Sequence, residues 1–234
     1  MAKKKLSLFL TLLLLLATAC QKASTQKEPP KTFKEAKLIV YELTKKINNT
    51  TLYCQCPIIW TNKKYGKPDL KKCGYTVRKQ KQRANRIEIE HIVPASFLGK
   101  NRQCWLKGGR KNCIKSDKLY NQMSANLYNL WPAVGEVNAD RSNYPFNIVT
   151  KPGYIYGRKK FKIDFKKKIA EPPDDVKGLV ARTYLYMNDK YNLNLSKEQR
   201  KLYQNWNRKY PAKDWEKQRE QAIKTYQGET AYYN

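Results

Sequence analysis

The sequence predicts an α+β protein, in which helices are mixed with short strands, and three patterns indicate this class. Apolar residues recur at helical spacing over residues 32–48, and again over 173–192 and 196–228. Apolar and polar side chains alternate over residues 86–93, as in a strand with one buried face. The stretches between these segments are rich in Gly, Pro and aromatic residues, which favour loops and short strands.

The length of the chain indicates how many domains it forms, and its charge indicates what class of partner it binds. The chain has 234 residues, 41% of them hydrophobic, which suits one domain over residues 32–234. Lys and Arg number 48 against 19 for Asp and Glu, and the net charge is +29. Such an excess predicts a polyanionic partner, most simply nucleic acid. The alternatives are an AT-rich genome, which favours Lys codons, and an acidic lipid surface as the partner.

The N-terminus has the pattern of an export signal. Lysines precede an apolar run at 6–16 and small residues at 17–19, so residues 1–19 are predicted to be a signal peptide. Residues 20–31 are polar, contain adjacent prolines and read as a linker. Cys20 fits lipid attachment as in bacterial lipoproteins, and plain secretion fits equally. Both place the mature protein in the periplasm, on the outer membrane or outside the cell.

An oxidising compartment makes disulfides more probable than metal binding for the remaining cysteines. Cys104 and Cys113 are the best candidates for a bridge, which would close a short loop around residues 108–110. A disulfide that closes a loop of this size stabilises the folded protein by about 2–3 kcal/mol. One thiol is left free if Cys20 carries a lipid, and otherwise all six cysteines could pair, in any of 15 connectivities.

The elements follow in order along the chain. The first helix, 32–48, has an apolar face, and residues 52–76 predict loops and short strands tied by disulfides. The strand at 86–93 ends at Pro94, and a Gly-rich loop follows. Pro132 fits the first turn of a helix.

The rest of the chain is predicted from the same signals. The helix that begins at Pro132 runs on to about residue 143, and residues 145–166 form strand or loop. Helices over 173–192 and 196–228 complete the chain, and the second of these is interrupted at Pro211.

The segment "RIEIEHIVPAS" contains His91, the single histidine, directly after Glu90. Imidazole titrates near neutrality and can act as a general base, and nearby cations would keep it unprotonated. Glu90 offers a hard oxygen ligand for Mg²⁺. Neighbours on an ideal strand point to opposite faces, so the strand must end, bulge or twist here if both residues serve one site.

Four further polar residues are candidates for a phosphodiesterase site. Asn138 can supply a neutral oxygen to the metal, and Arg110 can bind a phosphate through two nitrogens. Arg141 shares a helix face with Asn138 and would hold the helix or a phosphate, and Lys111 is another candidate for substrate contact. Each of these residues alone is more often structural.

Together these segments resemble the bacterial endonuclease I family of periplasmic or secreted non-specific nucleases. The similarity is carried by "EHIVPAS" (90–96), "NRQCWLKGGRKNC" (101–113), "NLYNLWPAVGEVNADRSNY" (126–144) and the C-terminal segment 206–228. It extends over roughly residues 33–230. Ser124 and Asn126 depart from it, because relatives often carry acids in this segment.

The resemblance implies a ββα-metal core, also called a His-Me finger, within a nuclease domain. It implies that His91 is the general base, that Arg110 stabilises the scissile phosphate, and that Glu90 and Asn138 bind Mg²⁺, with Mn²⁺ or Ca²⁺ as substitutes. The expected substrates are DNA and also RNA, cut to 5′-phosphate products by a monomer.

Two other functions fit part of these observations. A non-catalytic DNA-binding or DNA-uptake lipoprotein on the same scaffold would explain the charge and the Cys20 signal. A cationic envelope-binding protein would explain the charge alone. The set of Glu90, His91, Arg110 and Asn138 favours the enzyme over both.

Overall fold

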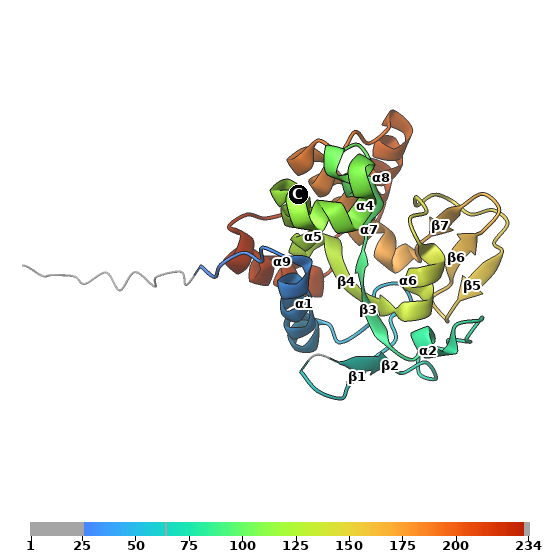
Figure 1. Cartoon of the computed structure of the whole chain (residues 1–234). Helices are drawn as coiled ribbons and strands as arrows, with labels where there is room; N and C mark the ends of the chain where they lie inside the picture. Colours follow the sequence, from blue (N-terminus) through green and yellow to red (C-terminus); the bar gives the residue numbers. More distant parts are fainter. Residues whose placement is uncertain (1–25, 64, 232–234) are drawn as a thin grey trace, which may run out of the picture.

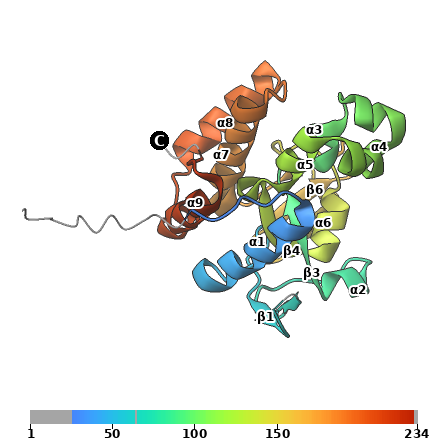
Figure 2. The ribbon, with the colours of Figure 1, turned by 60° about the vertical axis from the view of Figure 1, so that its left-hand side comes forward.

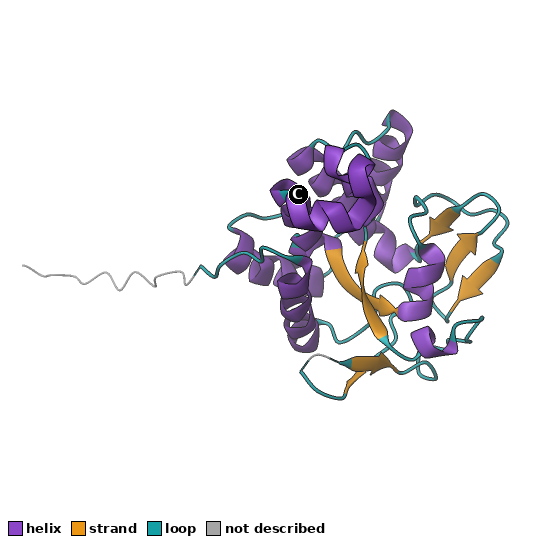
Figure 3. Cartoon of the chain, in the orientation of Figure 1, coloured by secondary structure: helices purple, strands orange, loops and turns teal. Residues whose placement is uncertain are grey.

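The structure is a computed structural model that describes residues 26–63 and 65–231. Its helices are α1 (Phe33–Ile47), α2 (Lys81–Ala84), α3 (Ala95–Gly99), α4 (Gln103–Ser116), α5 (Lys118–Ala125), α6 (Gly135–Arg141), α7 (Asp174–Tyr191), α8 (Lys197–Lys209) and α9 (Asp214–Gln227), with a 3-10 turn, η1, at Leu127–Asn129. Its strands are β1 (Ile58–Trp60), β2 (Gly66–Pro68), β3 (Ile87–His91), β4 (Leu130–Val134), β5 (Tyr154–Tyr156), β6 (Phe161–Asp164) and β7 (Ile169–Glu171). The predicted α+β class is confirmed (Figure 3).

An antiparallel pair of strands, β3 and β4, lies at the centre of the fold (Figure 1). Ile87 pairs with Val134 and His91 with Leu130, so the two strands are matched along their length. Helix α6 follows β4 directly and contacts both strands. The chain therefore forms a strand–strand–helix unit in which the end of β3 faces α6.

Helices cover this central pair, as both ribbon views show. Helix α1 packs on β4, and α1 and α6 lie on either side of the strands (Figures 1 and 2). Helix α1 begins where the Thr32 side chain accepts a hydrogen bond from the Glu35 backbone (3.2 Å). Its buried residues Ala36, Val40 and Leu43 recur at helical spacing, as the sequence predicted.

The C-terminal helices also match their predictions. Helix α7 occupies the predicted 173–192 segment, and α8 packs along it. Pro211 lies between α8 and α9, where the break was expected. Strands β5, β6 and β7 form a separate antiparallel sheet in the 145–171 region (Figure 3).

Pro132 contradicts its prediction. It lies inside β4, opposite Ile89, and the helix begins only at Gly135. A two-stranded sheet leaves one edge of each strand unpaired, and a proline nitrogen needs no partner there. The helix signal was therefore read three residues too early.

Two disulfides are present in the described part of the chain. Cys104–Cys113 confirms the predicted bridge, and Cys56–Cys73 links the segment before β1 to the segment after β2. Cys54 is buried as a free thiol. Cys20, the predicted signal peptide and its lipid attachment lie outside the described residues. Within residues 26–63 and 65–231, no helix has the length and apolar character that a membrane span requires.

Candidate active site

A cavity of about 400 Å³ opens beside the end of β3. Its wall includes all four residues predicted to act on a phosphodiester: Glu90, His91, Arg110 and Asn138. They come from β3, from α4 and from α6, and in sequence they span almost fifty residues. The structure therefore brings the predicted set to one place.

His91 is held in a defined orientation. Its Nε2 lies 2.9 Å from the backbone carbonyl of Ser124, and a carbonyl only accepts, so Nε2 carries the proton. The Phe33 ring lies against the imidazole, with ring centroids 4.6 Å apart. The neutral ring then keeps its lone pair on Nδ1, which is the atom able to accept a proton.

The electrostatics favour this neutral form. Burial of the ring, and then the positive charge of Arg110, lower the pKa of His91 to about 3. The charge of Arg110 acts in the direction that the sequence predicted, and burial is the larger cause. At physiological pH the imidazole is therefore unprotonated.

Glu90 is buried and only partly engaged. Its Oε1 accepts hydrogen bonds from the Tyr53 hydroxyl (2.7 Å) and from Arg141 Nη1 (2.9 Å). Its Oε2 takes no hydrogen bond from the described residues and is left to face the cavity. Burial raises the pKa of Glu90, against the opposing effect of Arg141, and a bound cation would favour the ionised form.

Asn138 offers a second oxygen. Its Nδ2 donates to Glu88 Oε2 at 2.8 Å, which leaves Oδ1 for the cavity that Asn138 lines. Carboxylate and amide oxygens are ligands that Mg²⁺ accepts, and the ion keeps several waters in addition. Glu90 and Asn138 therefore offer two oxygens of the kind that such a cation binds.

The strand ends where the sequence analysis required it to. Glu90 and His91 are neighbours in β3, yet both line the cavity. His91 is the last residue of the strand, so the cavity wraps around the strand end. The alternation of faces is no obstacle at that position.

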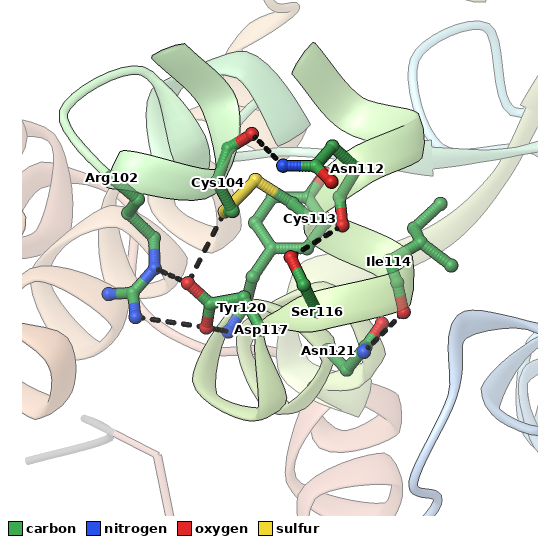
Figure 4. Close-up of a disulfide and its surroundings, with 9 residues drawn as sticks. All are labelled: Arg102, Cys104, Asn112, Cys113, Ile114, Ser116, Asp117, Tyr120 and Asn121. Atoms are coloured by element: carbon green, nitrogen blue, oxygen red, sulfur yellow. Dashed lines mark hydrogen bonds and ion pairs between the residues drawn. A yellow bond between two sulfur atoms is a disulfide. The ribbon is translucent and has the colours of Figure 1, made fainter. Parts of the chain in front are cut away.

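Arg110 reaches the cavity from a kink in α4. Gly109, directly before it, has φ +61°, in the left-handed region that favours glycine. The Cys104–Cys113 disulfide closes this kink (Figure 4). The exposed guanidinium lies 5.5 Å from the centre of the Phe33 ring, which also contacts His91.

Arg141 corrects one prediction. It has no exposed surface, and its guanidinium donates to Glu90 Oε1, to the backbone carbonyls of His91 and Ile92, and to the Tyr184 hydroxyl. This burial rules out contact with a phosphate and fits the other expectation, that Arg141 holds the helix. Lys111 is exposed and does not line the cavity, and its contact with substrate stays a prediction.

Sequence reasoning missed two supporting residues. Tyr53 lies 37 positions before its partner Glu90, and nothing local marks that contact. Glu88 was detectable, because residues two apart on a strand share a face, and the alternation in "IEIEH" places Glu88 beside Glu90.

The chain matches known proteins over most of its length. The family model described as Endonuclease I matches residues 22–233. The chain is 46% identical over 203 residues to the protein named Endonuclease-1 from Buchnera aphidicola subsp. Acyrthosiphon pisum (strain APS), covering 87% of this chain and 80% of that protein.

Two proteins of Aeromonas hydrophila are similarly related. An extracellular deoxyribonuclease is 49% identical over 181 residues, which are 77% of this chain and 79% of that protein. A periplasmic deoxyribonuclease is 44% identical over 226 residues, which are 96% of this chain and 91% of that protein.

Proposed function

The chain belongs to the endonuclease I family, and from this premise we propose that it is an exported, metal-dependent endonuclease that hydrolyses DNA to 5′-phosphate products with little sequence preference. The printed names of its relatives support DNA as the substrate and the periplasm or the medium as the location. One observation carries the mechanism: a neutral, oriented imidazole shares a cavity with two oxygen ligands and a guanidinium.

His91 is the general base in this proposal. Nδ1 takes a proton from the attacking water, whose oxygen forms a bond to phosphorus as the bond to the 3′ oxygen breaks. The Ser124 carbonyl, 2.9 Å from Nε2, stabilises the imidazolium that results. The products are a 5′-phosphate end and a 3′-hydroxyl, which takes its proton from solvent.

Glu90 and Asn138 hold the cation. When bound, Mg²⁺ neutralises charge on the scissile phosphate and the leaving oxygen. Glu90 supplies the charged ligand and is itself fixed by Tyr53 and Arg141. Mn²⁺ and Ca²⁺ accept the same oxygens and are the expected substitutes.

Arg110 binds the phosphate that is cut. Its fork of donors matches two phosphate oxygens and stabilises charge that grows in the transition state. The net charge of +29 supplies sequence-independent attraction to the backbone. Contacts of this kind do not read bases, so we extend the proposal to RNA.

The test is hydrolysis of supercoiled plasmid by purified protein with Mg²⁺, with EDTA, and after Mg²⁺, Mn²⁺ or Ca²⁺ is restored. We expect nicking and linearisation that EDTA abolishes and Mg²⁺ restores, and end-labelling should find 5′-phosphates. Retardation of plasmid without cutting would overturn the proposal in favour of a non-catalytic DNA-binding protein. Cutting that resists EDTA would remove the metal from the mechanism.

A further inference from the structure

Glu88 stands at the centre of a hydrogen-bonded cluster just outside the cavity. Arg83 donates to both of its carboxylate oxygens, through Nε at 3.0 Å and through Nη2. Arg86 donates to Oε1 from Nε at 2.9 Å and from Nη2 at 2.7 Å. Asn138 donates from Nδ2 to Oε2 at 2.8 Å.

These partners leave Asn138 one orientation. An ionised carboxylate only accepts hydrogen bonds and the two guanidinium groups only donate, so Glu88 requires a donor from the amide. A rotation of the amide by half a turn would set Oδ1 against the Glu88 oxygen. The NH₂ group therefore faces Glu88, and Oδ1 is directed away from it.

The packing holds α6 against the cluster. The backbone nitrogen of Gly135, the first residue of α6, donates to the Arg86 carbonyl at 3.0 Å. A Cβ at Gly135 would lie 2.5 Å from the Arg83 carbonyl and 3.0 Å from Glu88 Oε1, so only glycine fits at this approach. The distance between Glu88 and Asn138 is thus set by the backbone.

We propose that Glu88 is a positioning residue for the metal: it fixes the Asn138 amide so that Oδ1, and not the NH₂ group, faces the cation. This inference rests on the proposed function, and it adds a residue to the site that does not touch substrate. Arg83 and Arg86 keep Glu88 charged and in place. Without Glu88 the amide would sample both orientations, one of which repels the cation.

The test compares Glu88→Gln and Glu88→Ala with Glu171→Gln, a control that removes a carboxylate paired with Lys177 and Lys162 and not part of the cavity wall. Two readouts are used: Mn²⁺ binding by isothermal titration calorimetry in the absence of DNA, and the Mg²⁺ concentration for half-maximal plasmid cleavage. We expect Glu88→Ala to weaken both by about 10–100-fold. The KM of Glu88→Ala for DNA should stay near that of the wild type. Glu171→Gln should show the Mn²⁺ affinity and the Mg²⁺ requirement of the wild type.

A second set of variants guards against simple loss of fold. Asn138→Asp places a carboxylate against Glu88, and we expect it to weaken Mn²⁺ binding. Adding Glu88→Gln to Asn138→Asp restores a hydrogen bond of reversed polarity, from the new amide to the new carboxylate. We therefore expect the double variant to bind Mn²⁺ more tightly than Asn138→Asp alone.

The outcomes separate this inference from the proposed function. If the wild type needs Mg²⁺ but Glu88→Ala binds Mn²⁺ as the wild type does, the role of Glu88 is refuted and the endonuclease stands. Strictly additive effects in the Asn138→Asp series would refute it as well. Cleavage by the wild type in EDTA would instead overturn the metal mechanism on which the inference rests.

Discussion

Three contacts set the tautomer, the protonation state and the orientation of the His91 imidazole. The Ser124 carbonyl sets the tautomer, burial and Arg110 lower the pKa to about 3, and the Phe33 ring limits rotation of the imidazole. None of these contacts occupies Nδ1. A single histidine thus combines the protonation state, the tautomer and the orientation that a general base needs.

The His91→Ala substitution tests this at the scale of one residue. We expect the rate of plasmid cleavage to fall by about 10²–10⁴-fold, the usual contribution of a general base. DNA affinity, measured by fluorescence anisotropy in EDTA, should change little because the phosphate contacts remain. Added imidazole should recover part of the activity by occupying the vacated space. A variant that cuts at the wild-type rate would exclude His91 as the base.

At the scale of the elements, the disulfide in α4 constrains the backbone that carries Arg110 without contacting its side chain. Cys104–Cys113 spans the glycine kink, the Asn112 amide donates to the Cys104 carbonyl at 2.8 Å, and Arg102 holds Asp117 beside the bridge (Figure 4). Arg110 projects from inside this closed segment. We infer that the bridge fixes where the guanidinium lies.

A double-mutant cycle tests the coupling. We expect Arg110→Ala to lower kcat by about 10²-fold, as the loss of a transition-state donor does, and Cys104→Ser/Cys113→Ser to lower it less. Combining them should cost no more than Arg110→Ala alone, because the bridge would then have nothing left to position. If the cysteine changes lower kcat by the same factor in both backgrounds, the bridge does not act through Arg110.

The predictable elements are those with a local signal. Helix α1 combines an apolar period with the Thr32 cap, and Pro211 marks the gap between α8 and α9. The sequence predicts a Gly-rich loop where the structure has α4, because Gly108 and Gly109 interrupt the helical pattern and the helical turns on either side are joined by the disulfide. Tyr53 meets Glu90 only when distant segments come together, so its local sequence could not reveal that contact, whereas the alternation along β3 indicates that Glu88 lies beside Glu90.

At the scale of the whole molecule, the chain carries a net charge of +29 and also buries several acids. Glu90, Glu216 and Glu220 are all buried, and burial raises the pKa of each. The first two have arginine partners, Arg141 and Arg182. Glu220 has an Oε1 atom without a hydrogen-bond partner in the described part of the chain, and its pKa is raised to about 7.

The raised pKa of Glu220 makes the stability of the protein depend on pH. Between about pH 4.5 and 7 the unfolded chain has released this proton while the folded protein retains it. The free energy of unfolding then falls as the pH rises through that window. His91, whose pKa is lowered, contributes the opposite slope as the pH falls below about 6.5.

The Glu220→Gln substitution isolates the first contribution, because glutamine keeps the shape and never ionises. We expect its Tm to match the wild type near pH 4.5 and to exceed it by a few degrees at pH 8, since each kcal/mol shifts Tm by about 2–4 °C at this size. Glu198→Gln is the control, because hydrogen bonds at the start of α8, first from its own backbone, lower the pKa of exposed Glu198. Its Tm difference should therefore have the opposite sign and shrink in acid. A Glu220→Gln protein whose Tm difference does not change with pH would mean that the buried carboxyl is already ionised at pH 5.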